Sequence, residues 1–169
     1  MIYTVSVLDK LKNDTSEQDE AKLQLLQNSF ISQLDQYGFS SIRPPSLLRI
    51  SRETFRPTYE GFDLGFNLSA SDMIRTIWAY LFGLLEVARV GDTNHLGILI
   101  LDEPRQQRAD KVSFAEFAKR AATTLEAGQQ VLFLTSEDPE TLSAMLEGTP
   151  HQYLNFDGKM IQPLALANQ

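Results

Sequence analysis

The run GILILDEP constrains the fold of this chain more than any other stretch. Four aliphatic residues, Ile98 to Leu101, lead without a break into Asp102, Glu103 and Pro104. Such a run is typical of a strand that is buried on both faces in the middle of a parallel sheet. Two adjacent carboxylates at the end of a buried strand are unfavourable unless a cation or hydrogen-bond donors engage them. Ligands of open α/β sheets bind beyond the carboxyl ends of the strands, so Asp102 and Glu103 are the first candidates for a site. The alternative interpretation is a plain surface turn that Pro104 ends.

The other elements follow from apolar spacing and from turn and capping signals. In chain order we expect a short strand over 2–8, an amphipathic helix over 16–37, a strand over 47–51, a long apolar helix opened by LSASD and ended by 91–94, a helix with apolar residues from 114 to 125, a strand over 130–135, a short helix over 139–147, and a hairpin of 153–156 with 160–164. Thr15 with Gln18 is a capping-box signal, and Gly38 is the expected C-terminal cap. The predicted core face of the long helix consists of Ile74, Ile77, Trp78, Leu81, Leu85 and Ala88.

This alternation of strands and helices predicts an α/β fold, a layered sheet with helices and right-handed crossovers. No repeat or low-complexity linker divides the chain. We therefore expect a single domain over 1–169, with a strand and an amphipathic helix in 1–40 and the sheet-containing lobe in 41–169.

The charge of the chain limits its partners. The net charge of −7 excludes a general polyanion-binding protein, so any nucleic-acid contact needs a local basic patch. The one basic concentration lies in the stretch 42–56 and consists of Arg43, Arg49, Arg52 and Arg56. These arginines are candidates for phosphate contacts, and the alternative is that they lie on an exposed face of a sheet.

Several classes of protein are not indicated. The chain has no cysteine, and its two histidines, His95 and His151, are far apart, so the sequence does not predict a zinc site. The most apolar window, 76–85, is too short to span a bilayer, and the amino terminus lacks the features of a signal peptide. We expect a cytoplasmic protein without a membrane partner, with Trp78 in the core and His95 in a loop.

Three segments together favour a nucleotide site. Residues 68–72 (LSASD) form a small polar loop before a helix, whose free N–H groups and serine hydroxyls suit a phosphate. The strand that ends in Asp102 and Glu103 offers one carboxylate for magnesium and a second to orient a water molecule. The strand over 130–135 ends in a polar Thr-Ser-Glu turn.

In this order and spacing, residues 60–150 resemble the carboxy-terminal half of an ABC-type ATPase head of the SMC and RecN-like kind. LSASD resembles the family signature LSGGQ/E, ILILDEP closely matches the Walker B strand, RQQRAD resembles the D-loop, and LFLTSED resembles the strand before the switch loop. The resemblance implies the C-terminal lobe of a P-loop ATPase head. Such a lobe couples ATP-driven head dimerisation to DNA binding or processing, as in repair or defence.

The resemblance also implies roles for individual residues. Asp102 would hold Mg²⁺, Glu103 would be the catalytic base, and Ser69 would reach the γ-phosphate of ATP bound to a second head. The other residues that the motifs place at the nucleotide or at the dimer seam are Ser71, Gln106, Gln107, Asp110 and Ser136. The helix over 16–37 would re-enter the head from a coiled-coil arm.

The sequence departs from the family in ways that define the alternatives. It contains no G-x-x-x-x-G-K-S/T, so ATP and Mg²⁺ would bind only with a Walker A lobe supplied by the parent chain or by a separate polypeptide. Ala70 and Ser71 replace the signature glycines, and Ser136 replaces the switch histidine. These departures favour the first alternative, a degenerate head that acts as a dimerisation or scaffold module. A metal-dependent nuclease of the TOPRIM kind is a further alternative, but the Asp-x-Asp pair of that fold is absent.

Overall fold

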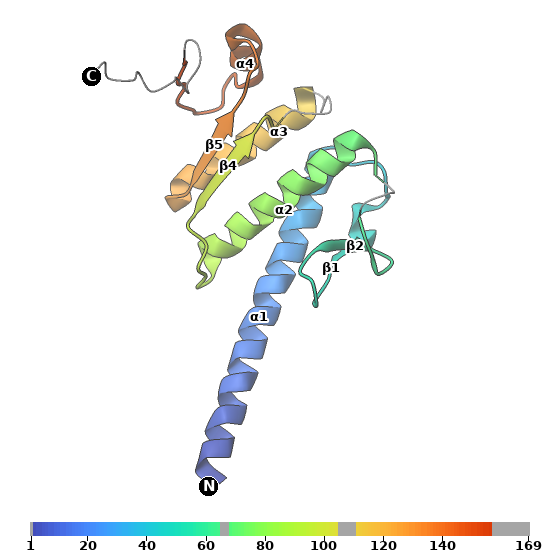
Figure 1. Cartoon of the computed structure of the whole chain (residues 1–169), viewed down its shortest axis with the longest axis vertical. Coiled ribbons are helices and arrows are strands. Elements are labelled where there is room, and N and C mark those ends of the chain that lie inside the picture. The colour runs from blue at the N-terminus through green and yellow to red at the C-terminus, as the bar shows by residue number, and fades with distance from the viewer. Residues whose placement is uncertain (1, 65–67, 105–110, 157–169) are drawn as a thin grey trace, which may run out of the picture.

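The computed structural model describes residues 2–64, 68–104 and 111–156. Within these residues the chain is a mixed α/β protein with four α-helices and two small sheets (Figure 1). No helix in these described ranges is long and apolar enough to cross a membrane.

The first helix, α1 (Ile2–Gln36), has 35 residues, and its N-terminal part extends away from the rest of the molecule (Figure 1). The predicted strand over 2–8 is wrong, because this segment is the beginning of α1. Its β-branched residues favour a strand only where a neighbouring strand can pair with them, whereas a helix satisfies its backbone groups internally. The predicted helix over 16–37 is confirmed as part of α1, but the capping-box signal at Thr15 marks no helix start.

Gly38 ends α1 as predicted. It adopts a left-handed conformation with φ 72°, and its N–H donates to the carbonyl of Asp35 at 3.2 Å. The N–H of Phe39 donates to the carbonyl of Leu34 at 3.0 Å. These bonds satisfy carbonyls that the end of a helix leaves open.

The second long helix is α2 (Ala70–Val90). It lies between α1 and a layer formed by the strands β4 (Ile98–Asp102) and β5 (Gln130–Leu134) and the helix α3 (Lys111–Ala122) (Figure 1). It approaches α1 closely at Gly83, where an added Cβ would lie 2.8 Å from Leu26 Cδ1. On its other side, Trp78 stacks on Phe117 of α3 (Lys111–Ala122) with ring centroids 4.3 Å apart. Trp78 is therefore a core residue, as predicted.

The predicted core face of α2 is only partly right. Trp78 and Leu85 are buried, but Ile77 is 44% exposed, while Phe82, which the periodicity did not select, is fully packed at 1% exposure. Because α2 packs against α1 on one side and α3 on the other, its buried surface is wider than a single apolar stripe and shifted around the helix axis.

A small antiparallel sheet follows α1. The strand predicted at 47–51 is confirmed as β1 (Leu48–Ile50), which comes after a short 3₁₀ turn, η1 (Pro45–Leu47). It pairs with β2 (Pro57–Tyr59), which pairs in turn with β3 (Phe62–Asp63). The pairing of β2 with β3 is a hairpin for which the sequence predicted no strands.

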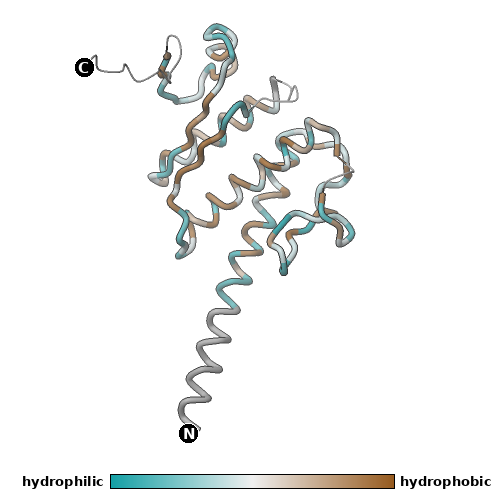
Figure 2. The backbone as a smooth tube through the Cα atoms, in the orientation of Figure 1, coloured by the Kyte–Doolittle hydropathy of each residue, from teal (hydrophilic) through white to brown (hydrophobic). Residues whose placement is uncertain are grey.

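The second sheet consists of the strands predicted around Ile98–Leu101 and over 130–135. β4 (Ile98–Asp102) and β5 (Gln130–Leu134) are parallel, and the connection between them contains α3 and the 3₁₀ segment η3 (Thr123–Ala127). Gly128 ends this connection with φ 67°. Both predicted strands are confirmed, and both lie in an apolar part of the backbone tube (Figure 2).

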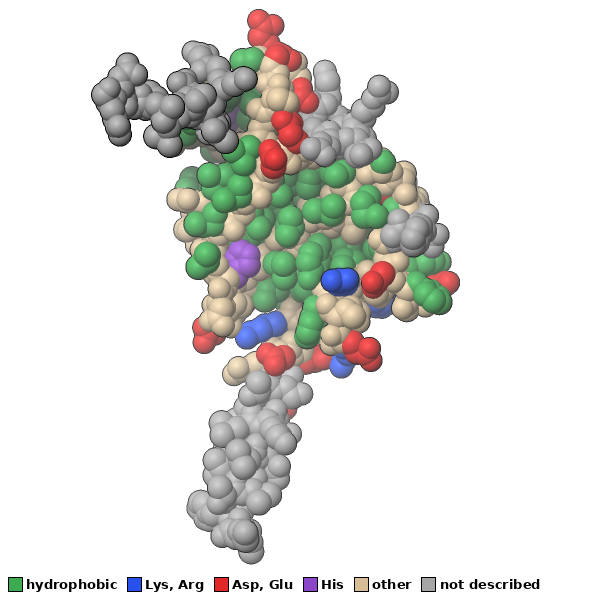
Figure 3. Space-filling model, viewed as in Figure 1, with side chains coloured by type: hydrophobic (Ala, Val, Ile, Leu, Met, Phe, Trp, Pro, Cys, Tyr) green, Lys and Arg blue, Asp and Glu red, His purple; other side chains and the backbone are tan. Residues whose placement is uncertain are grey.

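The prediction that these strands are buried on both faces is wrong. Leu99 is buried, and Phe133 packs against the aromatic side chains of α3, so one face of the sheet is covered. The other face carries apolar side chains that are 44–65% exposed: Ile98, Ile100, Leu132 and Leu134. Figure 3 shows apolar side chains spread over this side of the molecule. We call these four residues the open sheet face.

The last helix begins as predicted. Asp138 caps α4 (Pro139–Met145), and its Oδ1 accepts a hydrogen bond from the N–H of Thr141 at 2.8 Å. Of the predicted hairpin, residues 153–156 form no strand, and residues 160–164 lie outside the described part of the chain.

Candidate functional site

The carboxyl end of β4 brings Glu103 onto the end of β5. Asp102 is the last residue of β4 and its side chain is exposed, whereas Glu103 is half-buried. The N–H of Glu103 donates to the carbonyl of Leu134 at 2.8 Å, which extends the strand pairing by one residue. Its Oε1 accepts a hydrogen bond from the N–H of Ser136 at 2.8 Å, and its Oε2 lies 3.5 Å from the hydroxyl of Thr135. The structure thus unites two predicted site residues, Glu103 and Ser136, and adds Thr135, which the sequence analysis did not select.

The backbone of Glu103 is strained. Its φ of 45° lies in the left-handed region, where a residue with a side chain pays about 1–2 kcal/mol. Such strain persists only where surrounding contacts hold it, and it is concentrated at functional sites. Here the contacts are the hydrogen bonds to Leu134 and Ser136, which turn the Glu103 carboxylate toward β5 and leave Asp102 on the outside.

The Asp102 carboxylate is chemically suited to a hard cation. Mg²⁺ is bound in proteins by one or two carboxylates and keeps several of its waters, so one exposed carboxylate is an acceptable ligand. Across the described residues no hydrogen bond or ion pair engages this carboxylate, and no group of three or more metal-ligating side chains occurs there. Asp102 fits Mg²⁺ as one ligand, and the remaining ligands would be waters or groups from a nucleotide or a partner.

The second candidate segment is the start of α2. Ser69 is the N-cap, its side chain is exposed, and its hydroxyl accepts a hydrogen bond from the N–H of Asp72 at 3.2 Å. The hydroxyls of Ser69 and Ser71 lie 3.2 Å apart. The N–H of Ser69 donates to the hydroxyl of Ser41 at 3.1 Å. The predicted helix start is confirmed, and it presents two serine hydroxyls at the positive end of a helix.

Below these serines lies a buried ion pair that the sequence analysis missed. The Asp72 side chain is 0% exposed, and its Oδ1 accepts a hydrogen bond from Arg75 Nη1 at 2.7 Å. Its Oδ2 accepts bonds from the N–H of Ser41 at 2.7 Å and the hydroxyl of Ser41 at 2.6 Å. The N–H and hydroxyl of Ser40 donate to the same oxygen at 3.1 and 3.3 Å. The sequence signal was the Asp–Arg spacing of three within an otherwise apolar helix.

This cluster continues to α1 and α3. Arg75 Nε and Nη2 donate to the hydroxyl of Ser113 in α3 at 3.1 and 3.0 Å, and that hydroxyl donates to the carbonyl of Tyr37 at 2.8 Å. Although burial raises the pKa of Asp72, the hydrogen bonds from Ser41, Arg75 and Ser40 outweigh it and hold that pKa below its usual value. Asp72 is therefore ionised near neutral pH within the fold.

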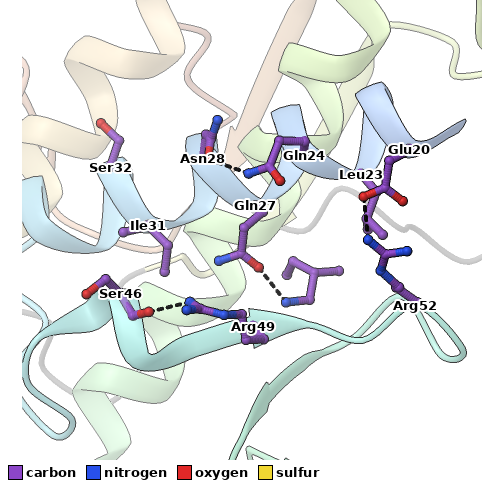
Figure 4. Close-up of a pocket in the computed structure, with 11 residues that line it drawn as sticks. Glu20, Leu23, Gln24, Gln27, Asn28, Ile31, Ser32, Ser46, Arg49 and Arg52 are labelled. Carbon is purple, nitrogen blue, oxygen red and sulfur yellow. Dashed lines mark hydrogen bonds and ion pairs between the residues drawn. The ribbon is translucent and has the colours of Figure 1, made fainter. Parts of the chain in front are cut away.

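The four predicted nucleic-acid residues are all exposed. Arg49 and Arg52 line a groove of about 590 Å³ between α1 and β1 (Figure 4). Arg43 and Arg56 are not among the residues that line it. Arg52 pairs with Glu20 at 2.5 Å, and Arg56 lies 4.0 Å from Asp63.

Within the groove, Arg49 donates to backbone carbonyls, including that of Leu48 at 2.9 Å. Gln27 of α1 accepts a hydrogen bond from the N–H of Ile50 at 2.7 Å and donates to the carbonyl of Leu48 at 3.0 Å. Its amide side chain thus occupies the outer edge of β1, where another strand would otherwise pair (Figure 4).

Of the other predicted positions, Gln106, Gln107 and Asp110 lie outside the described residues. His95 lies in the loop before β4, as predicted, and its Nδ1 accepts a hydrogen bond from the N–H of Gly97 at 3.0 Å.

Comparison with known proteins adds no relative. No protein-family model matches this chain, and neither a curated protein nor a solved structure does. The interpretation of the site therefore depends on its own chemistry.

Proposed function

We propose that this chain is the C-terminal lobe of an SMC/ABC-like ATPase head, and that it completes an ATP/Mg²⁺ site together with an N-terminal Walker A lobe. The observation that carries the proposal is the carboxyl end of β4. An exposed Asp102 lies there beside a strained Glu103 that is bonded to the polar turn of the neighbouring parallel strand. Ligand sites of parallel sheets occupy this position.

The open sheet face supports the need for a second lobe. Parallel strands occur almost only in sheets that are covered on both faces, and sheets of two strands are marginal by themselves. In this chain β4 and β5 present Ile100 at 65% exposure and three further aliphatic side chains on one face. A lobe that covers this face would remove the apolar surface from water and build the second wall of the site.

The residues of this chain would contribute three functions. Asp102 would hold Mg²⁺, which when bound would neutralise the phosphate charge. Glu103 would orient the attacking water, because its carboxylate is placed by Ser136 and Thr135. Ser69, with Ser71 beside it, would donate to the γ-phosphate of a nucleotide on a second head. The ATP-driven contact between two heads would then be coupled to DNA.

A non-hydrolysing head that serves as a dimerisation or scaffold module is the second candidate. The Glu103 carboxylate already accepts a hydrogen bond from the N–H of Ser136, at the position where the resembled family has its switch histidine. A carboxylate that is held in this way within the lobe fits a structural role.

ATP turnover in the reassembled head distinguishes these candidates. The chain is combined with a P-loop-containing half from the parent chain or from an adjacent reading frame. Turnover is measured for the wild type, Asp102→Ala, Glu103→Gln and the exposed control Glu126→Gln. We expect Asp102→Ala and Glu103→Gln to reduce turnover by at least about 100-fold and the control to change it little. Absence of any nucleotide-dependent change in the reassembled wild type would refute the ATPase proposal. A dimer that forms equally with and without ATP would support the scaffold.

A further inference from the structure

We propose that Ser41 is the positioning residue for Ser69, and that the buried Asp72 carboxylate fixes Ser41 for this task. The inference rests on the proposed function, because it assigns a role in placing the hydroxyl that would meet the nucleotide. Ser41 lies outside every motif that suggested that function, whereas Ser69 and Asp72 belong to LSASD.

The Ser41 hydroxyl connects the two partners. It donates to Asp72 Oδ2 at 2.6 Å and accepts a hydrogen bond from the N–H of Ser69 at 3.1 Å. Because its one proton is committed to the carboxylate, its lone pairs face the Ser69 N–H. A hydrogen bond to an ionised acceptor is about twice as strong as a neutral one, so this orientation is well defined.

Asp72 is itself held on all sides. Both of its oxygens are engaged, one by Arg75 and the other by Ser40 and Ser41, and the side chain is 0% exposed. The carboxylate therefore has no freedom to turn away from Ser41. Because the Asp72 side chain is removed from solvent, its charge is screened less than that of a surface carboxylate.

The same network reaches the helix that protrudes from the body. Arg75 donates to Ser113, and Ser113 donates to the carbonyl of Tyr37 in the turn that ends α1. Ser40 and Ser41 follow that turn directly. The position of the Ser69 backbone is therefore set by the end of α1, so that a displacement of this helix would move the serine that meets the phosphate.

Ser40 provides a matched control. Its hydroxyl also donates to Asp72 Oδ2, at 3.3 Å, but no hydrogen bond links it to Ser69. Ser40→Ala and Ser41→Ala each remove one hydroxyl from the same carboxylate, and only the second removes the acceptor of the Ser69 N–H. Ser41→Thr keeps the hydroxyl.

The first measurement uses the isolated chain and needs no nucleotide. Amide hydrogen exchange at Ser69 should be at least about 10-fold faster in Ser41→Ala than in wild type, because the hydrogen bond that protects this N–H is lost. Ser40→Ala should change it by less than about 2-fold, and Ser41→Thr should restore protection. Equal exchange in Ser40→Ala and Ser41→Ala would overturn the positioning role.

The second measurement is ATP turnover in the reassembled head. We expect Ser41→Ala to lower kcat by about 10- to 100-fold, since a misplacement of about 1 Å has effects of this size, with little change in KM. In a Ser69→Ala background, Ser41→Ala should lower kcat no further, because both substitutions remove the same contact with the nucleotide. Additive effects would overturn the role of Ser41 toward the nucleotide. A reassembled wild type without turnover would instead refute the ATPase function, and with it that role, while the exchange result would still report the contact between Ser41 and Ser69.

Discussion

Two acidic residues of this protein, Asp72 and Asp102, have opposite environments. Asp72 at the start of α2 is fully buried, and five hydrogen bonds from Ser40, Ser41 and Arg75 satisfy it within the chain. Asp102 at the end of β4 is exposed, and no hydrogen bond or ion pair from the described residues engages its carboxylate. A buried anion is tolerated within a fold only where it is paired, whereas an exposed one at a strand end is available for a ligand. The difference separates the self-sufficient part of the molecule from the part that we propose to be half of a site.

The largest expected loss of stability follows from substitution of Asp72. Asp72→Ala should lower the free energy of unfolding by about 3–5 kcal/mol, because it breaks the buried ion pair with Arg75 and removes the acceptor of the hydrogen bonds from Ser40 and Ser41. Asp102→Ala should change that free energy by less than about 0.5 kcal/mol. Denaturant unfolding of the isolated chain measures both. Similar losses for the two variants would show that the contrast between buried and exposed acid has no energetic counterpart.

The next prediction compares the loss of stability on truncating a side chain on each face of β4. Leu99→Ala should lower the free energy of unfolding by about 2–5 kcal/mol, since Leu99 lies on the covered face and its truncation leaves a cavity. Ile100→Ala should cost less than about 1 kcal/mol in the isolated chain, because its side chain is 65% exposed. The same Ile100→Ala should weaken binding of a complementing lobe in a titration of the two halves. An Ile100→Ala variant that unfolds as readily as Leu99→Ala would show that the open sheet face is already covered within this chain.

Protonation of the Asp72 carboxylate at low pH should reproduce part of the stability loss of Asp72→Ala. The pKa of Asp72 is lower in the folded protein than in the unfolded chain, so its contribution to stability is complete above the unfolded pKa of about 3.9. That contribution is lost as the pH falls through the lower folded pKa. The difference in unfolding free energy between wild type and Asp72→Asn should therefore be constant near neutral pH and shrink below about pH 4. A difference that grows toward acid pH would contradict this sign.

The smallest effect concerns Glu103. Glu103→Ala removes the acceptor of the Ser136 N–H and should cost about 0.5–1.5 kcal/mol. The exposed control Glu126→Ala should cost less than about 0.5 kcal/mol. Thermal or denaturant unfolding of the two variants checks this comparison. A loss above about 3 kcal/mol for Glu103→Ala would place Glu103 with the structural residues and favour the scaffold alternative.

Local sequence signals predicted much of the secondary structure. Gly38 predicts where α1 ends and Asp138 predicts where α4 begins, because caps act through neighbouring backbone groups. The two strands of the parallel sheet and the helix between them follow from apolar runs and helical spacing. The place of Asp102 and Glu103 at the end of a strand was likewise visible in the sequence.

What the sequence determined, then, is most of the helices, the strands β1, β4 and β5, and the chemical groups at the ends of these elements. Only the tertiary structure decided which distant residues bond to each other and which faces of the elements are covered. It joined Ser41 to Asp72 and Ser69, residues about 30 positions apart, and it left one face of β4 and β5 uncovered. The physical reason is that capping and periodicity depend on neighbours within a few residues, whereas burial and charge pairing depend on which distant elements meet.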